Sequence, residues 1–340
     1  MTLRARAGTP KRKGKEMPPA KAPASTRPKA VQQRNRRQTA KQENEQPQIL
    51  MEATVEISEV PLASHRPPIK ILLYGPPGVG KTRLSGGAPN AVFLSTEIEG
   101  AVSAKVAGSR ARLWPAPTWP HAVAGIKKAV LELGEDDWLI VDSGTNMQEM
   151  YMRWILATIH AKNPQRDLDI PAIKDHQKYQ NGFKRWVDQL IDGPMNVIFI
   201  CNSMNAEDAE GEPRVIPLLL GKKGEISDYI SAQFGVALYY SVARESREAD
   251  AIGPDIVRRV LAQPYPPWFA KDRYDALGSH RDVEYKDDTA MATMIDDLQK
   301  ARKEIGNLPD RSTRPKRDGR ASSSSQPRRS VRRVASKARQ

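Results

Sequence analysis

The 340-residue chain combines 39% hydrophobic residues with a formal net charge of +14, and it contains a single cysteine, Cys201. One cysteine excludes a disulfide framework and a cysteine-based zinc site, and it favours a reducing compartment. No apolar run is long enough to span a membrane, and the basic N-terminus lacks the apolar segment of a secretory signal. We therefore expect a cytoplasmic protein with one large domain or two small ones.

The charge is concentrated at the two ends of the chain. Residues 1–50 and residues 301–340 each carry a net charge of +10, which leaves −6 on residues 51–300. Both ends are rich in polar and basic residues, so they cannot bury enough apolar surface to offset their ordering entropy. We predict disordered basic tails over residues 1–60 and 301–340 around one domain over residues 61–300. Such tails bind polyanions or serve only as solvated, solubilising segments.

Within this domain, short apolar runs alternate with helical patterns. The predicted strands are residues 69–74, 91–95, 138–141, 196–201, 235–242 and 256–261. The predicted helices are residues 119–133, 147–160 and 177–191, with Trp154 among the packing positions of the second and with Phe183, Trp186, Val187 and Leu190 facing inward in the third. Strands separated by helices indicate an α/β fold with a mostly parallel sheet, and the last two strands are expected to be partly antiparallel.

The strongest motif follows the first predicted strand. Its residues are Gly75, Pro76, Pro77, Gly78, Val79, Gly80, Lys81 and Thr82, which fit G-x-x-x-x-G-K-[ST] in full. Glycines at these positions let backbone N–H groups converge on phosphate oxygens. Lys81 would reach the β- and γ-phosphates of ATP, and the Thr82 hydroxyl would bind Mg²⁺. The helix after the motif must be short, because Gly86, Gly87 and Pro89 end it.

Three polar residues after later strands complete the predicted site. Asp142 ends the apolar run 138–141, which is the Walker B pattern, and would hold the Mg²⁺ shell. Glu97, with Glu99 as the alternative, would act as the base or orient water near the γ-phosphate. Asn202 follows the strand 196–201, where an amide could sense the γ-phosphate. The simpler alternatives are that Glu97 and Glu99 are solvated loop carboxylates and that Asn202 is a hydrogen-bonded turn residue. For Asp142, the alternative is that many buried strands end in Asp without binding a metal.

The order of these elements resembles the RecA-like class of P-loop ATPases, over about residues 67–280. The short helix after the P-loop and the block 178–190 are similar to phage-encoded recombinases that bind and anneal single-stranded DNA. The resemblance implies a RecA-like P-loop core, ATP and Mg²⁺ as cofactors, and the host cytoplasm as the location. Asn202 departs from the family, whose members more often carry Gln or His there.

The resemblance also implies a trans-acting element and DNA-binding loops. Lys271 and Arg273 are similar to the Lys-x-Arg element that reaches the ATP of a neighbouring subunit in a ring or filament. Their spacing of two residues directs both side chains to one side; the plain alternative is two surface cations. Candidate DNA segments are residues 161–178 and 206–223, with lysines on the backbone and an aromatic residue such as Tyr179 stacking on bases.

Three functions fit this pattern. The first is an ATP-hydrolysing protein that binds single-stranded DNA, self-associates, and promotes annealing, recombination or replication. The second is a DNA-binding scaffold whose ATP site only gates assembly without hydrolysis. The third is a P-loop kinase, which would have no need of two basic tails. Turnover that rises on addition of single-stranded DNA would distinguish the first function from the others.

Overall fold

A computed structural model describes residues 65–97, 99–245, 255–284 and 287–305, all within one compact unit. The predicted tail over residues 1–60 lies outside these ranges, and so does the predicted tail over residues 301–340 apart from residues 301–305. The strands are β1 (Lys70–Gly75), β2 (Ala91–Ser95), β3 (Arg112–Pro115), β4 (Trp138–Asp142), β5 (Asn196–Glu207), β6 (Pro213–Pro217), β7 (Val236–Glu245), β8 (Asp255–Leu261), β9 (Lys271–Asp272) and β10 (His280–Val283). The helices are α2 (Lys81–Ser85), α3 (Gly100–Val106), α4 (Trp119–Glu132), α5 (Gly144–Lys162), α6 (Ile173–Ile191), α7 (Glu225–Gln233) and α8 (Ala290–Ile305), with a 3₁₀ turn η2 (Lys222–Gly224).

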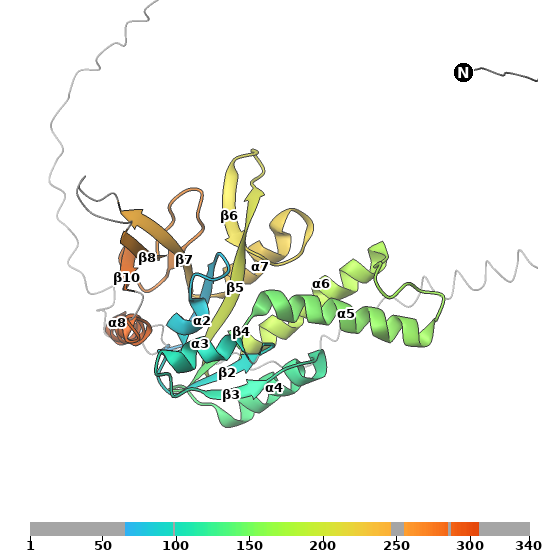
Figure 1. The fold of residues 1–340 in the computed structure, drawn as a ribbon, viewed down its shortest axis with the longest axis horizontal. Helices are drawn as coiled ribbons and strands as arrows, with labels where there is room; N and C mark the ends of the chain where they lie inside the picture. The colour runs from blue at the N-terminus through green and yellow to red at the C-terminus, as the bar shows by residue number, and fades with distance from the viewer. Residues whose placement is uncertain (1–64, 98, 246–254, 285–286, 306–340) are drawn as a thin grey trace, which may run out of the picture. The chain divides into compact units, whose positions relative to one another are not determined.

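The strands form one sheet in the order β10-β8-β7-β1-β5-β4-β2-β3, with β6 paired to β5 and β9 paired to β7. The six strands from β7 to β3 are parallel, whereas β8, β10, β6 and β9 pair antiparallel. The chain therefore has the α/β fold with a mostly parallel central sheet that the sequence predicts, and it has a RecA-like P-loop core. Figure 1 shows this arrangement.

Strand β5 is longer than the sequence predicts, and it changes partner along its length. Its first residues pair with β1 and β4, up to Asn202 opposite Gly75. From Ser203 onward it pairs antiparallel with β6 in a hairpin that extends past the end of β1. Asn202 thus lies where the central sheet gives way to the hairpin. Figure 1 shows the hairpin of β5 and β6.

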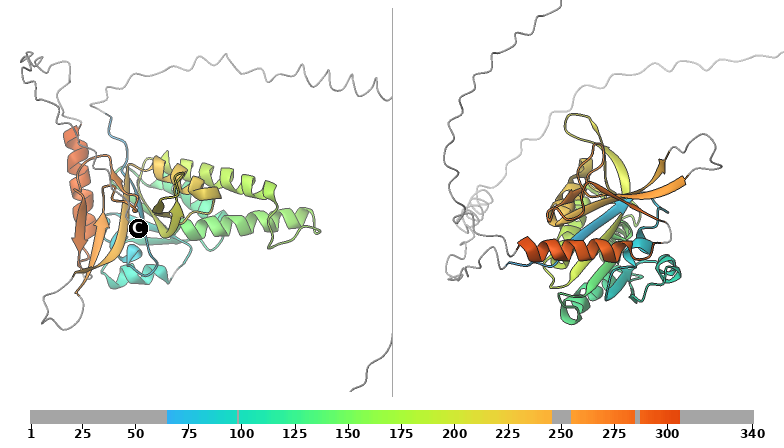
Figure 2. Two further views of the ribbon diagram at one scale, coloured as in Figure 1. Left: turned by 90° about the horizontal axis from the view of Figure 1, so that it is seen from above. Right: turned by 90° about the vertical axis from the view of Figure 1, so that its left-hand side faces the viewer.

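Alternating side chains of β1 point to opposite faces of the sheet, and each face has its own hydrophobic core. Leu72 and Tyr74 pack with residues of α4, α6 and α7, whereas Ile71 and Leu73 pack with residues of α2, α3 and α8. Figure 2 shows α8 running along its face of the sheet. The sheet is therefore buried on both faces, as expected for parallel strands joined by helices.

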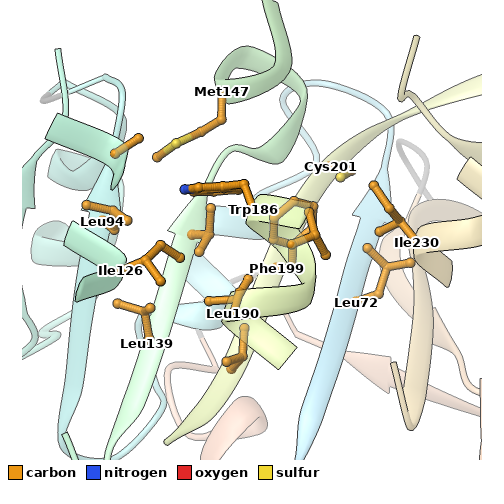
Figure 3. Close-up of a cluster of buried hydrophobic side chains, with 14 of the residues drawn as sticks. Leu72, Leu94, Ile126, Leu139, Met147, Trp186, Leu190, Phe199, Cys201 and Ile230 are labelled. Carbon is orange, nitrogen blue, oxygen red and sulfur yellow. The ribbon is translucent and has the colours of Figure 1, made fainter. Parts of the chain in front are cut away.

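The larger core confirms most of the predicted inward positions. Phe183, Trp186, Val187 and Leu190 of α6 are all buried, and the ring of Trp186 lies 6.4 Å from that of Phe199 (Figure 3). Cys201 is fully buried in the same cluster, and burial raises the pKa of its thiol to about 12. Trp154 was predicted to pack inward, but it is 41% exposed, because Ile155 and Leu156 take the buried positions of α5.

The helices of the described part of the chain include none that is both long and apolar enough to cross a membrane. Helix α8 continues to Ile305, and its residues Met291, Met294, Ile295 and Leu298 are buried against the sheet. This helix therefore crosses the position where the sequence analysis places the end of the domain.

We expect Asn196→Ala to lower the free energy of unfolding by about 2–4 kcal/mol. The buried Asn196 side chain accepts from Ile69 N–H at 2.8 Å and donates to Glu135 C=O at 2.6 Å, so it joins the starts of β1, β4 and β5. Alanine leaves both backbone groups unpaired. Urea denaturation measures the change, with the exposed Asn163→Ala as control, which should stay within about 0.5 kcal/mol. A loss below about 1 kcal/mol at Asn196 would contradict this account.

Candidate functional site

The P-loop joins β1 to α2 and depends on glycines at both ends. A Cβ on Gly75 would lie 1.9 Å from the carbonyl oxygen of Tyr240 in β7, so no side chain fits where β1 ends. Gly78 and Gly80 have φ angles of 78° and 102°, which other residues rarely adopt. Between them Val79 is buried, whereas Pro77 is exposed and Pro76 is half-buried. Val79 is therefore the apolar anchor of the loop.

Lys81 lies across the loop rather than pointing into solvent. Its ammonium donates to the carbonyls of Gly75 at 2.9 Å and Pro76 at 2.8 Å, and to Asn202 Oδ1 at 3.0 Å. Burial lowers the pKa of Lys81 to about 8, although nearby Asp142 acts to raise it. The structure thus brings together Lys81 and Asn202, which lie 121 residues apart in the chain.

Thr82, in the first turn of α2, meets Asp142 at the carboxyl end of β4. Thr82 Oγ1 donates to Asp142 Oδ2 at 2.7 Å. Burial raises the pKa of Asp142, while Thr82 and Lys81 act in the opposite direction. A hydroxyl beside a carboxylate is an oxygen donor pair of the kind that Mg²⁺ takes alongside phosphate oxygens. These residues therefore fit the metal role that the sequence predicts for them.

Glu97 and Glu99 occupy different surroundings. Glu97 Oε1 accepts from Asn146 Nδ2 at 2.5 Å, and the Glu97 charge acts to raise the pKa of Asp142. A Cβ on Gly100 would lie 3.7 Å from Glu97 Cβ and 3.9 Å from Asp142 Oδ2, so both acids flank this glycine. Glu99 is the N-cap of α3 and makes no side-chain capping bond. The geometry favours Glu97 as the acid of the site.

Asn202 connects the P-loop to the segment after β6. Its backbone N–H donates to Thr145 Oγ1 at 3.1 Å, and its carbonyl accepts from Leu218 N–H at 2.6 Å. Thr145 in turn donates to Leu218 C=O at 3.0 Å. One turn further along α5, the fully buried Gln148 donates to Leu220 C=O at 2.9 Å and accepts from Leu220 N–H at 2.6 Å. Hydrogen bonds therefore hold the segment 218–220 against both β5 and α5, and we call this set of bonds the clamp.

Beyond this clamp lies a groove of about 1290 Å³ between α6 and the segment around η2. Both candidate DNA segments contribute to it, with Lys174 from the first and Lys222 from the second, and both lysines are exposed. Arg166 forms an ion pair with the buried Asp175. Tyr179 was proposed to stack on bases, but it is 1% exposed and its ring stacks on Tyr151, so it offers no free face.

Lys271 and Arg273 lie at the opposite end of the sheet from the P-loop. Strand β9 pairs with Val236 and Ala237, at the start of β7, whereas the P-loop follows the end of β1. Lys271 Nζ donates to Ser231 C=O at 2.8 Å, and both side chains donate to Ala232 C=O at the end of α7. Cations at a helix C-terminus stabilise its last carbonyls. In their own chain these residues therefore cap α7.

Four further residues lie around the site and are not predicted from the sequence: Asn146, Thr145, Gln148 and Arg258. The first three lie on α5 just after Asp142, where polar residues at a spacing of three could have been noticed. Arg258 Nε donates to Val79 C=O at 2.9 Å, from β8. Side chains alternate along a strand, so Arg258 lies on the same face of β8 as the buried Val260. This alternation is the only feature of the sequence that could have indicated an inward position for Arg258.

Comparisons with known proteins bear on this arrangement. No curated protein matches the chain. The chain is similar to the crystal structure of the flagellar accessory protein FlaH from Methanocaldococcus jannaschii, with 13% identity, coverage of 60% of this chain and 82% of that one, and a TM-score of 0.28. The model of the AAA domain family matches residues 67–274, from the residues before β1 to those after β9. Because the matched residues make up more than half of this chain, the chain belongs to the AAA domain family and has the fold of a P-loop ATPase.

Proposed function

We propose that this protein binds and hydrolyses ATP with Mg²⁺, and that single-stranded DNA stimulates the hydrolysis. The observation that carries the proposal is the meeting of the two P-loop side chains with their partners. Lys81 contacts Asn202, and Thr82 contacts Asp142, so the residues predicted for phosphate and metal binding lie together. Bound Mg²⁺ would neutralise phosphate charge, with Thr82 and Asp142 as its protein ligands.

The surrounding side chains support a hydrolytic role. Glu97 is exposed, so its carboxylate is accessible to water, and Asn146 fixes one of its oxygens. A carboxylate held in this way can accept a proton from a water molecule and orient it. Lys81 supplies positive charge from a buried position, where electrostatic interactions are stronger than in water. Because Asn202 Oδ1 accepts a hydrogen bond from Lys81 Nζ, a movement of that ammonium would change the position of the Asn202 side chain.

The link to DNA rests on the groove and on its connection to the P-loop. The hydrogen bonds from Asn202 through Thr145 and Gln148 to residues 218–220 lead to the edge of the groove that carries Lys222. A ligand that shifts this edge would therefore act on Asn202. Exposed lysines suit a nucleic acid backbone, and binding would be independent of sequence. Annealing, recombination or replication is the setting that we propose, with a phage as the source.

We further propose that the protein self-associates, with Lys271 and Arg273 acting on a neighbouring copy. Their place in and just after β9 supports this idea, because β9 pairs with the start of β7, away from the P-loop of their own chain. Arg273 is exposed, so its guanidinium is accessible to another copy. A cation supplied in trans to a phosphoryl transfer site accelerates the reaction by several orders of magnitude in other ATPases and GTPases.

ATP hydrolysis with and without single-stranded DNA tests the main proposal. We expect turnover that rises with DNA and falls at least about 100-fold in Glu97→Gln, because glutamine keeps the acceptor for Asn146 but cannot take a proton. Nucleotide affinity should persist in that variant. Glu99→Gln is the matched control and should stay within about twofold of wild type. ATP binding without turnover on any DNA would instead establish a non-hydrolysing, nucleotide-gated scaffold.

Removing two lysines from the groove tests the DNA surface. We expect Lys174→Ala/Lys222→Ala to weaken binding of a labelled oligonucleotide and to reduce the slope of log affinity against log salt by about 1.4, since each lost phosphate contact contributes about 0.7. The control, Lys105→Ala/Lys127→Ala, removes two exposed lysines elsewhere on the domain. Equal slopes in the two double variants would place the DNA away from this groove.

Mixing two inactive variants tests the trans-acting element. We expect Arg273→Ala to lower DNA-stimulated turnover at least about 100-fold, and we expect Lys81→Ala to abolish it. A mixture should regain part of the activity, because one variant supplies an intact P-loop and the other an intact Arg273. Arg302→Ala serves as control, since Arg302 lines the same pocket as Arg273 and donates to Pro67 C=O. Full turnover in Arg273→Ala alone would show that no trans contact is needed.

A further inference from the structure

An arginine of β8, a strand that β7 separates from β1, holds the middle of the P-loop. Arg258 Nε donates to Val79 C=O at 2.9 Å, across 179 residues of sequence, and a Cβ on Gly80 would lie 3.8 Å from the same nitrogen. Arg258 pairs with Val242 of β7 on one side and with Val283 of β10 on the other. Because β8 lies between two strands, the backbone that carries Arg258 is fixed relative to the loop.

The contact determines the direction of one backbone amide. The Val79–Gly80 peptide is planar and trans, so the Val79 carbonyl and the Gly80 N–H point in opposite directions. When Arg258 holds the carbonyl on its own side, the Gly80 N–H must point away from Arg258. Backbone N–H groups of this motif are the ones that hold nucleotide phosphates. The direction of this peptide therefore matters for the function proposed above.

The loop itself does not secure that direction. Val79 lies between Gly78 and Gly80, both with positive φ angles, and glycine tolerates many backbone conformations. The Val79–Gly80 peptide turns about one backbone bond of Val79 and one of Gly80, and Gly80 has no side chain to restrict its own bond. A rotation there would turn the N–H away from a phosphate. An external hydrogen bond to the carbonyl removes this freedom before any ligand binds, which is the usual benefit of preorganisation.

We propose that Arg258 is a positioning residue that holds the Val79–Gly80 peptide with its N–H directed to the nucleotide phosphates. The inference rests on the proposed nucleotide binding at the P-loop. Arg258 would act through the loop and need not touch the nucleotide. Arginine suits the task because its guanidinium is planar and its donors are fixed in direction, which lysine cannot reproduce.

The sequence allows a direct observation of this peptide. Val79–Gly80 is the only place in the 340 residues where glycine follows valine. Protein labelled with ¹³C-carbonyl valine and ¹⁵N-glycine therefore gives a single carbonyl–amide correlation in an NMR spectrum. We expect Arg258→Met to shift or broaden this signal in the absence of nucleotide, and to weaken ADP binding by about 10- to 100-fold, the worth of one hydrogen bond to a charged group.

The next residue supplies a matched control. Arg259 lies on the opposite face of β8 and pairs with Asp282, with bonds of 2.6 and 2.8 Å. Arg259→Met should leave the Val79–Gly80 signal in place and ADP affinity within about twofold. If Arg258→Met does not fold, Arg258→Lys takes its place. We then expect the same changes in the signal and in ADP affinity, but smaller ones.

The outcomes separate this inference from the proposed function. An unchanged signal in the Arg258 variant, or a changed signal with wild-type ADP affinity, would overturn the positioning role while leaving nucleotide binding intact. A wild-type protein that binds neither ADP nor ATP would overturn the proposed function itself. The expected result is that Arg258→Met changes the Val79–Gly80 signal and weakens ADP binding, whereas Arg259→Met does neither.

Discussion

The site depends on the position of β5 between β1 and β4. This order separates the P-loop strand from the strand that ends in Asp142, and it places Asn202 directly opposite Gly75. Lys81 can then bond to Asn202, and Thr82 reaches Asp142 from the first turn of α2. A sheet with β1 beside β4 would have no residue between the phosphate and metal ligands. The strand order thus determines which side chains can meet.

The same strand also connects the site to the rest of the domain. Past Asn202, β5 leaves the parallel sheet and enters the hairpin with β6, and Thr145 and Gln148 of α5 hold the segment that follows β6. The side chains of Thr145 and Gln148 are buried, and a buried polar group that loses its hydrogen bond is costly. The result is a continuous set of contacts from Lys81 to the groove beside α6.

The sequence predicted local features well and distant ones poorly. The P-loop, the short helix after it and the strand ending at Asp142 follow from residues close together in the chain. Arg258 could not be assigned, because its contact with Val79 depends on how β8 is placed in the folded sheet. Tyr179 was misjudged although it lies four residues before Phe183, on the buried stripe of α6. Trp154 was misjudged because the helical period defines a stripe of α5, but packing decides which of its positions are covered.

The burial of Cys201 has a practical consequence for studying movement in this domain. Maleimides and similar reagents attack the thiolate, and this thiol is both inaccessible and neutral at ordinary pH. Since it is the only cysteine in the chain, a new cysteine at an exposed position, such as Lys178 on α6 or Ser103 on α3, would carry a fluorophore alone. Pairs of such labels could report distances within one copy or between copies without any need to replace the native residue.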